Sequence, residues 1–388
     1  MKKLIPFAIA AVMAAAQLAG CSSPQSAPPS AAQPPASQAA QPPASQPPAS
    51  QPPSAQPPAS PPQAAPGNAA SGYVTGLGIA ASLSTSKSAA NSAAGSAVSY
   101  GTMVAVTLDP SGKITNCSID EVQPAVAFDA TGKITSDLTK EVKSKNEIGA
   151  GYGMKKASKI GKEWYEQADA FAQWAIGKTV GEVNGLQVKN VGSEAGVPDS
   201  PELTSSVTIS VASFKAALTK AAGGAAAGSP SPGPVKTGLG IVTTLNMSKS
   251  AAANAPGAAV GDSVVAAVSL DASGKIVQCK LDELQPTINF DSKGQITTDL
   301  KKAPQTKDEI RDAYGMAKAS GIGKEWYQQA DAFSQWAIGK TIAEIDGLQL
   351  KTVGSEAGVP DSPELTSSVT ISVGNFIKAI DKAAANAR

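Results

Sequence analysis

Short stretches in which apolar and polar residues alternate recur along the chain, and this period of two is the pattern of β-strands with one buried face. One stretch carries four apolar residues on a single face: Leu239, Ile241, Leu245 and Met247. Residues 264–270 and 276–282 follow as strands, and residues 271–274 between them have the Asp-Ala-Ser-Gly composition of a tight turn. Similar turns occur earlier at 109–112 and 129–132. The pattern predicts an antiparallel meander in each half of the chain.

After the predicted strands of each half, apolar residues recur at spacings of three and four, which is the pattern of one face of an α-helix. One segment has Trp164, Ala168, Phe171 and Ala175 at these spacings. A second has Val373, Phe376, Ile377 and Ile380. Strands followed by helices predict an α+β fold in which helices pack on an antiparallel sheet.

The chain contains two copies of one unit, because residues from Gly76 onward match residues from Gly238 onward at a constant offset of 162. The segment 191–211 is identical to the segment 353–373. This period is too long for a solenoid repeat, so we predict tandem domains, each large enough for its own core. The first predicted domain spans 73–222 and the second spans 236–388. A linker rich in Gly, Ala, Ser and Pro joins them at 223–235.

The N-terminal segment has the features of an export signal. Lys2 and Lys3 precede an apolar stretch, residues 4–19, that is too short for a comfortable transmembrane helix. It ends in Leu-Ala-Gly before Cys21, and this arrangement resembles the bacterial lipobox. The resemblance implies a signal peptide at 1–20, a diacylglycerol on the Cys21 sulfur and a chain anchored to the extracytoplasmic face of the cell membrane. An ordinary cleaved signal with an incidental cysteine is the alternative.

Residues 21–72 are predicted to form a disordered stalk. From 24 to 66 the chain is almost only Pro, Ala, Ser and Gln, so no apolar surface offsets the entropy of ordering. Proline favours the extended polyproline II conformation, which gives this segment a reach on the order of 130 Å. We expect a spacer that lifts the two domains off the membrane. Recognition of the stalk by a proline-binding domain is the alternative.

The composition excludes several classes of chemistry. Lys and Arg number 32 and Asp and Glu 31, so the net charge of +1 lacks the positive excess of a nucleic-acid-binding protein. Histidine is absent, which excludes Ser-His-Asp and Cys-His catalysis, histidine metal sites and histidine-ligated haem. Three cysteines are too few for a disulfide framework. With no nucleophile–base constellation, an enzyme of the cell envelope is the least favoured class.

Several residues invite a chemical interpretation but have a simpler structural one. Cys117 and Cys279 are expected to be small core residues, with an interdomain disulfide as the alternative. The Asp-Glu pairs at 120–121 and 282–283 are expected to be solvated charges at strand ends. Four tryptophans are expected to pack in helix cores, with stacking on a flat ligand as the alternative: Trp164, Trp174, Trp326 and Trp336.

A loop that precedes the last helix, residues 199–210, is identical to residues 361–372 in the second copy. Loops usually vary more than cores, yet here the loop is conserved between copies while the flanking strands differ. One interpretation is a helix cap, although a cap needs only one Ser or Thr and this loop has several. The other is a phosphate site, since helix N-termini attract anions and a threonine hydroxyl can hold phosphate by hydrogen bonds or as an ester.

Two tetrapeptides in this loop, Ser205-Ser206-Val207-Thr208 and Ser367-Ser368-Val369-Thr370, resemble the flavinylation motif of bacterial FMN-binding domains. In that motif an acidic residue, two variable residues, Ser or Thr, and Gly-Ala precede a threonine that receives FMN through a phosphoester bond. Glu202 and Glu364 stand at the acidic position here, and Ser-Val replaces Gly-Ala. The cofactor-binding residues that the resemblance implies are Thr208, Thr370, Ser205, Ser206, Ser367 and Ser368.

The signal, stalk and repeated motif together resemble lipid-anchored surface proteins with tandem flavinylated domains, which serve extracellular electron transfer in Gram-positive bacteria. The resemblance implies a redox carrier rather than an enzyme, with two FMN groups attached by a Mg-dependent flavin transferase. Electrons would come from a membrane quinone dehydrogenase system and pass to extracellular acceptors such as ferric iron. The tyrosines and tryptophans of 152–174 and 314–336 are candidate neighbours of the flavin ring. A surface binding module without a redox cofactor, such as an adhesin or a solute-binding lipoprotein, is the alternative.

Overall fold

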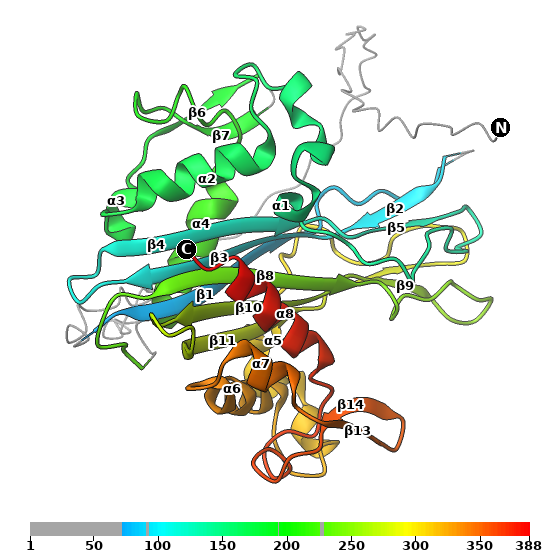
Figure 1. Ribbon diagram of the computed structural model, residues 1–388. Coiled ribbons are helices and arrows are strands. Elements are labelled where there is room, and N and C mark those ends of the chain that lie inside the picture. The colour runs from blue at the N-terminus through cyan, green and yellow to red at the C-terminus, as the bar shows by residue number, and fades with distance from the viewer. Residues whose placement is uncertain (1–71, 91–92, 193, 226–228) are drawn as a thin grey trace, which may run out of the picture. The chain divides into compact units, whose positions relative to one another are not determined.

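The computed structural model describes residues 72–90, 93–192, 194–225 and 229–388 (Figure 1). The predicted signal peptide, Cys21 and nearly all of the predicted stalk lie outside the described residues. The described chain combines antiparallel sheets with helices, which confirms the α+β prediction. Of the helices in these ranges, none combines the length and apolar character that a membrane crossing requires.

Each repeat is built on a three-stranded antiparallel sheet. In the first repeat the spatial order is β1 (Val74–Ser82), β3 (Tyr100–Leu108) and β4 (Ile114–Val122). In the second repeat it is β8 (Lys236–Thr244), β10 (Asp262–Leu270) and β11 (Ile276–Leu284). Matching registers, such as Gly78 opposite Val104 and Gly240 opposite Ala266, show that the two sheets are equivalent.

The prediction of a simple meander is wrong in one respect, because in each repeat a short strand lies in the sequence between the first and second strands of the three-stranded sheet. In the first repeat this strand, β2 (Gly95–Val98), pairs with β5 (Ala125–Phe128) to form a separate ribbon. In the second repeat β9 (Gly257–Val260) pairs with β12 (Thr287–Phe290) in the same way. The predicted turn at 271–274 is confirmed, with Gly274 at φ +81°.

The helical part of the first repeat follows the strands. It comprises α1 (Lys145–Ile148), η1 (Gly149–Tyr152), η2 (Met154–Lys156), α2 (Trp164–Ala175), α3 (Val180–Asn184), the hairpin β6 (Val188–Val191) and β7 (Glu194–Pro198), and α4 (Ala212–Ala225). The second repeat has α5 (Lys307–Ile310), η3 (Arg311–Tyr314), η4 (Met316–Lys318), α6 (Trp326–Ala337), α7 (Ile342–Asp346), β13 (Leu350–Val353), β14 (Glu356–Pro360) and α8 (Gly374–Ala385).

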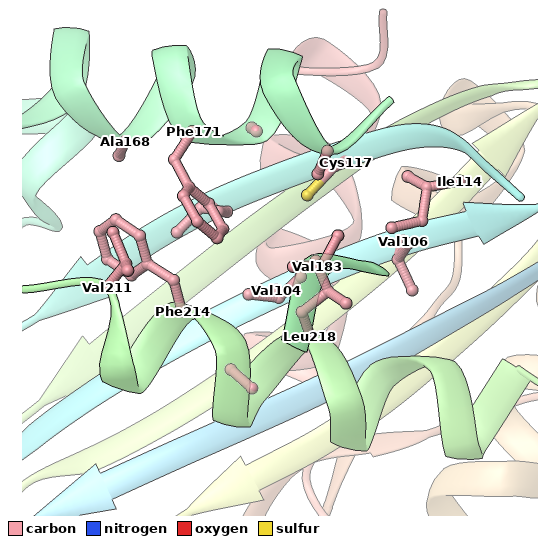
Figure 2. Close-up of a cluster of buried hydrophobic side chains, with 14 of the residues drawn as sticks. Val104, Val106, Ile114, Cys117, Ala168, Phe171, Val183, Val211, Phe214 and Leu218 are labelled. Carbon is pink, nitrogen blue, oxygen red and sulfur yellow. The ribbon is translucent and has the colours of Figure 1, made fainter. Parts of the chain in front are cut away.

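The outer face of each sheet is covered by two helices of its own repeat. In the first repeat Phe171 from α2 and Phe214 from α4 meet between the helices and the sheet, with ring centroids 5.6 Å apart (Figure 2). Helix α4 comes very close to β1, because a Cβ at Gly76 or Gly78 would lie about 2 Å from a helix carbonyl oxygen. Glycine is therefore required at these positions, since a side chain would push the helix off the strand.

The inner faces of the two sheets pack against each other and form a core shared by both repeats. It contains Ile79, Met103, Ala105, Val122, Leu239, Ile241, Val265, Ala267 and Leu284. This packing explains why β3 and β10 are buried along nearly their whole length. The stacked rings of Phe128 and Phe290, 4.1 Å apart, join the two short ribbons.

Four buried hydroxyls form a closed hydrogen-bonded ring between the sheets, which we call the hydroxyl ring. Its members are Thr75, Thr107, Thr237 and Ser269. Two bonds of 2.7 Å and 2.6 Å cross between the repeats, from Thr75 to Ser269 and from Thr107 to Thr237. In a closed ring every hydroxyl donates once and accepts once, so four polar groups are satisfied in an otherwise apolar interface.

The predicted linker at 223–235 begins too early, because α4 continues through its first three residues to Ala225. Ala225 is fully buried, so packing on the sheet holds this last turn in place despite two glycines. Further along, Ser231 pairs with Tyr73 through backbone hydrogen bonds of 2.7 Å and 2.8 Å. Part of the predicted linker is therefore tied to the start of the first repeat.

We expect Thr107→Val to lower the free energy of unfolding by about 1–3 kcal/mol. The substitution opens the hydroxyl ring, and one of the three hydroxyls that remain is then buried without an acceptor for its hydrogen. Denaturant unfolding of the full chain measures this change. Thr352→Val, at an exposed position of β13, is the matched control and should have little effect. Equal effects of the two substitutions would contradict the role of the hydroxyl ring.

Candidate functional site

The two predicted attachment threonines are held in the same way by a buried glutamine. The backbone N–H of Thr208 donates to Gln167 Oε1 at 2.9 Å, and the Thr208 hydroxyl donates to the same oxygen at 3.2 Å. Thr370 makes these bonds to Gln329 at 2.8 Å and 3.2 Å. Both glutamines are fully buried, on α2 and α6, whereas both threonines are half-buried.

A tryptophan seven residues after the glutamine holds the acidic end of the loop. The indole N–H of Trp174 donates to the Glu202 carboxylate, and the Lys178 ammonium lies 4.6 Å from the indole centroid. Seven residues are about two helical turns, so Gln167 and Trp174 share one face of α2 about 10 Å apart. The loop from Glu202 to Thr208 is therefore fixed at both ends to one helix.

The second repeat reproduces this arrangement. Trp336 donates to Glu364, and Lys340 lies 4.7 Å from the indole centroid and 3.7 Å from the Glu364 carboxylate. Each site thus combines a lysine, an exposed carboxylate and an aromatic ring close to the loop that carries the threonine.

The far end of the loop is held by the β6–β7 hairpin. Val211 N–H donates to Gly196 O at 3.0 Å, and Ser210 N–H donates to Glu194 Oε1 at 3.2 Å. Gly196 has φ +80°, and a Cβ there would lie 2.9 Å from the Ser210 hydroxyl. The hairpin and the loop therefore pack closely, and glycine is required at their contact.

The helix-cap interpretation does not account for the threonines. Helix α4 begins at Ala212, four residues after Thr208, and in the second repeat α8 begins without a side-chain cap. Packing explains part of the identity between the loops, since Leu203, Val207 and Val211 are buried in the core of the first repeat. It does not explain Ser205, which is exposed, or Thr208, whose hydroxyl points to a glutamine.

The remaining predicted binding residues have distinct environments. The Ser206 hydroxyl donates to Leu203 O at 3.2 Å, and Ser368 donates to Leu365 O at the same distance. Ser205 and Ser367 are exposed to solvent. The loop therefore presents the exposed Ser205 hydroxyl next to a segment of fixed conformation.

The expectation that the Asp-Glu pairs are solvated charges is wrong. Asp120 and Glu121 are buried in β4, and Glu121 forms an ion pair with the buried Lys145 at the start of α1. Glu283 and Lys307 form the equivalent pair. Glu121 lies under the helical part of its own repeat, where Tyr152 and Trp164 cover its partner Lys145, and the local pattern of the strand does not reveal this cover.

Aromatic rings surround the buried lysines. Lys145 lies 4.8 Å from the Tyr152 centroid and 4.9 Å from the Trp164 centroid. Burial alone would lower the pKa of Lys145, but the Glu121 carboxylate and the Tyr152 hydroxyl more than offset this and raise it. Tyr152 and Trp164, two of the predicted flavin neighbours, therefore contact a structural cation.

The expectation of core residues is confirmed for both cysteines and for two of the four tryptophans. Cys117 and Cys279 are free and buried, and burial raises the pKa of each thiol to about 12, which makes them unreactive. Trp164 and Trp326 pack in the cores, whereas Trp174 and Trp336 are only partly buried beside the loops. The outer tryptophans are thus the ones placed to meet a ligand.

The donor groups suit a phosphorylated aromatic ligand better than a metal. A half-buried threonine hydroxyl and the serine hydroxyls of the loop match a phosphate, and the partly buried indole and its lysine at the Glu202 end of the loop match a flat ring. Within the described ranges, no cluster of three acidic or cysteine side chains could hold a metal ion. Two cavities, one beside β4 and one at the end of β1, are lined by other residues than the threonines.

Comparisons with known proteins leave the family open. The chain matches no model of a protein family, and searches of curated proteins and of solved structures find no match either.

We expect stability to fall as the pH rises from about 4 to 7. Burial raises the pKa of Asp120 from 3.8 to about 6 and that of the partly buried Asp282 to about 7. Over this interval the folded chain retains protons that the unfolded chain has released, so the free energy of unfolding decreases with pH.

Asp120→Asn should remove this dependence at one site and stabilise the chain by on the order of 2–3 kcal/mol at pH 8, with a much smaller effect at pH 4. The asparagine oxygen can still accept the bonds from Glu121 N–H and Asn146 N–H. Chemical denaturation at the two pH values measures the effect, and the exposed Asp299→Asn is the control. An Asp120→Asn effect that is the same at both pH values would contradict the assignment.

Proposed function

We propose that this protein is an extracytoplasmic electron carrier that holds one FMN in each repeat, attached through a phosphoester bond to Thr208 and to Thr370. The observation that carries the proposal is the repeated anchoring of these threonines by Gln167 and Gln329, in loops that are identical between the repeats. When bound, the flavin supplies the redox chemistry, and the protein supplies attachment and orientation.

Three features of the loops support a flavin phosphate over other ligands. The threonine hydroxyl is half-buried, and its backbone is fixed by the same hydrogen-bond acceptor. Lys178 and Lys340 provide positive charge beside each loop. Trp174 and Trp336 are only partly buried, and each donates to the carboxylate at the acidic end of its loop. Covalent attachment also suits an extracytoplasmic carrier, because a flavin that dissociates outside the cell is lost.

Thr208 and Thr370 belong to opposite outer layers of the fold. Helix α2 with the β6–β7 hairpin lies on one side of the paired sheets, and α6 with the β13–β14 hairpin lies on the other (Figure 1). Both sheets lie between the helical layer that carries Thr208 and the one that carries Thr370. In the proposed carrier each flavin therefore exchanges electrons with external partners, namely a membrane quinone dehydrogenase system and acceptors such as ferric iron, rather than with the other flavin.

The lipid anchor on Cys21 and the stalk complete the proposal. A tether on the order of 130 Å would let the paired repeats move between a donor in the membrane and an acceptor further out. Neither feature belongs to the described residues, and both are proposed from the sequence.

We expect the full chain, produced together with a flavin transferase, to gain two FMN units in intact mass. Thr208→Ala and Thr370→Ala should each leave one unit, and the double variant none. Thr204→Ala, at an exposed threonine of the same loop, is the matched control and should keep both units. An unmodified mass in the wild-type chain would reject the flavin proposal and favour a surface binding module.

A further inference from the structure

The buried glutamine beside each attachment threonine makes hydrogen bonds that an apolar residue could not make, and two of them go to the threonine itself. We propose that Gln167 and Gln329 are positioning residues for flavin attachment, which hold the threonine hydroxyl with its lone pairs turned outward toward the incoming phosphorus. This inference rests on the proposed function and extends it to residues outside the flavinylation motif.

The orientation of the Gln167 amide is fixed by its surroundings. Its NH2 group faces the Lys162 carbonyl oxygen at 3.2 Å and the Ser158 hydroxyl at 3.4 Å. A carbonyl accepts hydrogen bonds only, so the amide oxygen must face the other way, toward Thr208. The second repeat repeats these distances with Gln329, Lys324 and Ser320.

One amide oxygen therefore fixes both the backbone and the side chain of the threonine. It accepts from the Thr208 N–H at 2.9 Å and from the hydroxyl at 3.2 Å. A hydroxyl has a single hydrogen, and once this is engaged by Gln167 only the oxygen lone pairs remain free. Such a nucleophile needs little reorganisation before it attacks.

The chemistry of attachment is compatible with an uncharged amide as the hydrogen-bond partner of the threonine hydroxyl. Thr208 Oγ1 attacks the flavin-side phosphorus of flavin adenine dinucleotide, the new O–P bond forms, and the bond from phosphorus to the bridging oxygen breaks. AMP leaves with that oxygen and the electron pair of the bond, the threonine proton passes to water, and nothing is oxidised or reduced. Because phosphoryl transfer has a loose transition state, the nucleophile gains charge late, and an amide that cannot accept a proton is sufficient.

The test compares Gln167→Leu with Gln167→Glu in the full chain, incubated with a flavin transferase and flavin adenine dinucleotide. A buried carboxyl stays protonated, so glutamate can donate to Lys162 O and still accept from Thr208. Trypsin releases the two sites on different peptides, 190–215 and 352–378, so the Thr370 site serves as an internal control in every molecule.

We expect Gln167→Leu to slow FMN attachment at Thr208 by about 100-fold, the cost of a misplaced nucleophile, and to leave attachment at Thr370 unchanged. Gln167→Glu should stay within about tenfold of the wild-type rate. Gln329→Leu should show the reverse pattern. Thermal unfolding of the unloaded chains then shows whether the variants share the same fold.

Two results would overturn this inference and leave the proposed function standing. One is attachment at the wild-type rate in Gln167→Leu, and the other is an equal loss at Thr208 in both Gln167 variants, which would mean that the glutamine only anchors the loop. A wild-type chain with no flavin on either peptide would instead reject the proposed function, and the inference with it.

Discussion

The structure depends on the burial of one sheet against the other. Each three-stranded sheet is apolar on both faces, and its own helices cover only the outer one. The second face is covered by the other repeat, through an apolar core, the stacked pair Phe128 and Phe290, and the hydroxyl ring. A single repeat would leave this surface without a cover, and the second repeat supplies one.

The same packing determines where the loops with the threonines lie. With the inner faces paired, α2 and α4 can pack only on the outer face of the first sheet, and α6 and α8 only on the outer face of the second. The close contact at Gly76 and Gly78 holds α4 on β1. The loop before α4, residues 199–210, therefore packs against α2. The two threonine sites face away from each other as a consequence.

The sequence predicted the local structure better than the relation between repeats. The helix faces at Trp164 and Phe376, the turn at 271–274 and the repeat itself are encoded by short-range patterns, and the structure confirms them. The second buried face, the ion pair of Glu121 with Lys145 and the continuation of α4 to Ala225 were missed, because each depends on contacts between distant segments.

At the site the sequence indicated the threonines and the carboxylates but not Gln167, which lies 41 residues from Thr208. Its signal was present in the apolar stripe of α2, where a glutamine interrupts a buried face in both repeats. A polar residue at a core position of a helix implies a partner, but the sequence does not say which.

The most direct test of the two-flavin carrier is an anaerobic reductive titration of the loaded full chain, followed at the flavin absorbance band and completed by re-oxidation with a ferric chelate. The account predicts reversible bleaching, half the amplitude when either Thr208 or Thr370 is replaced by alanine, and none when both are replaced. An absorbance band that survives both replacements, or a wild-type chain without one, would contradict it.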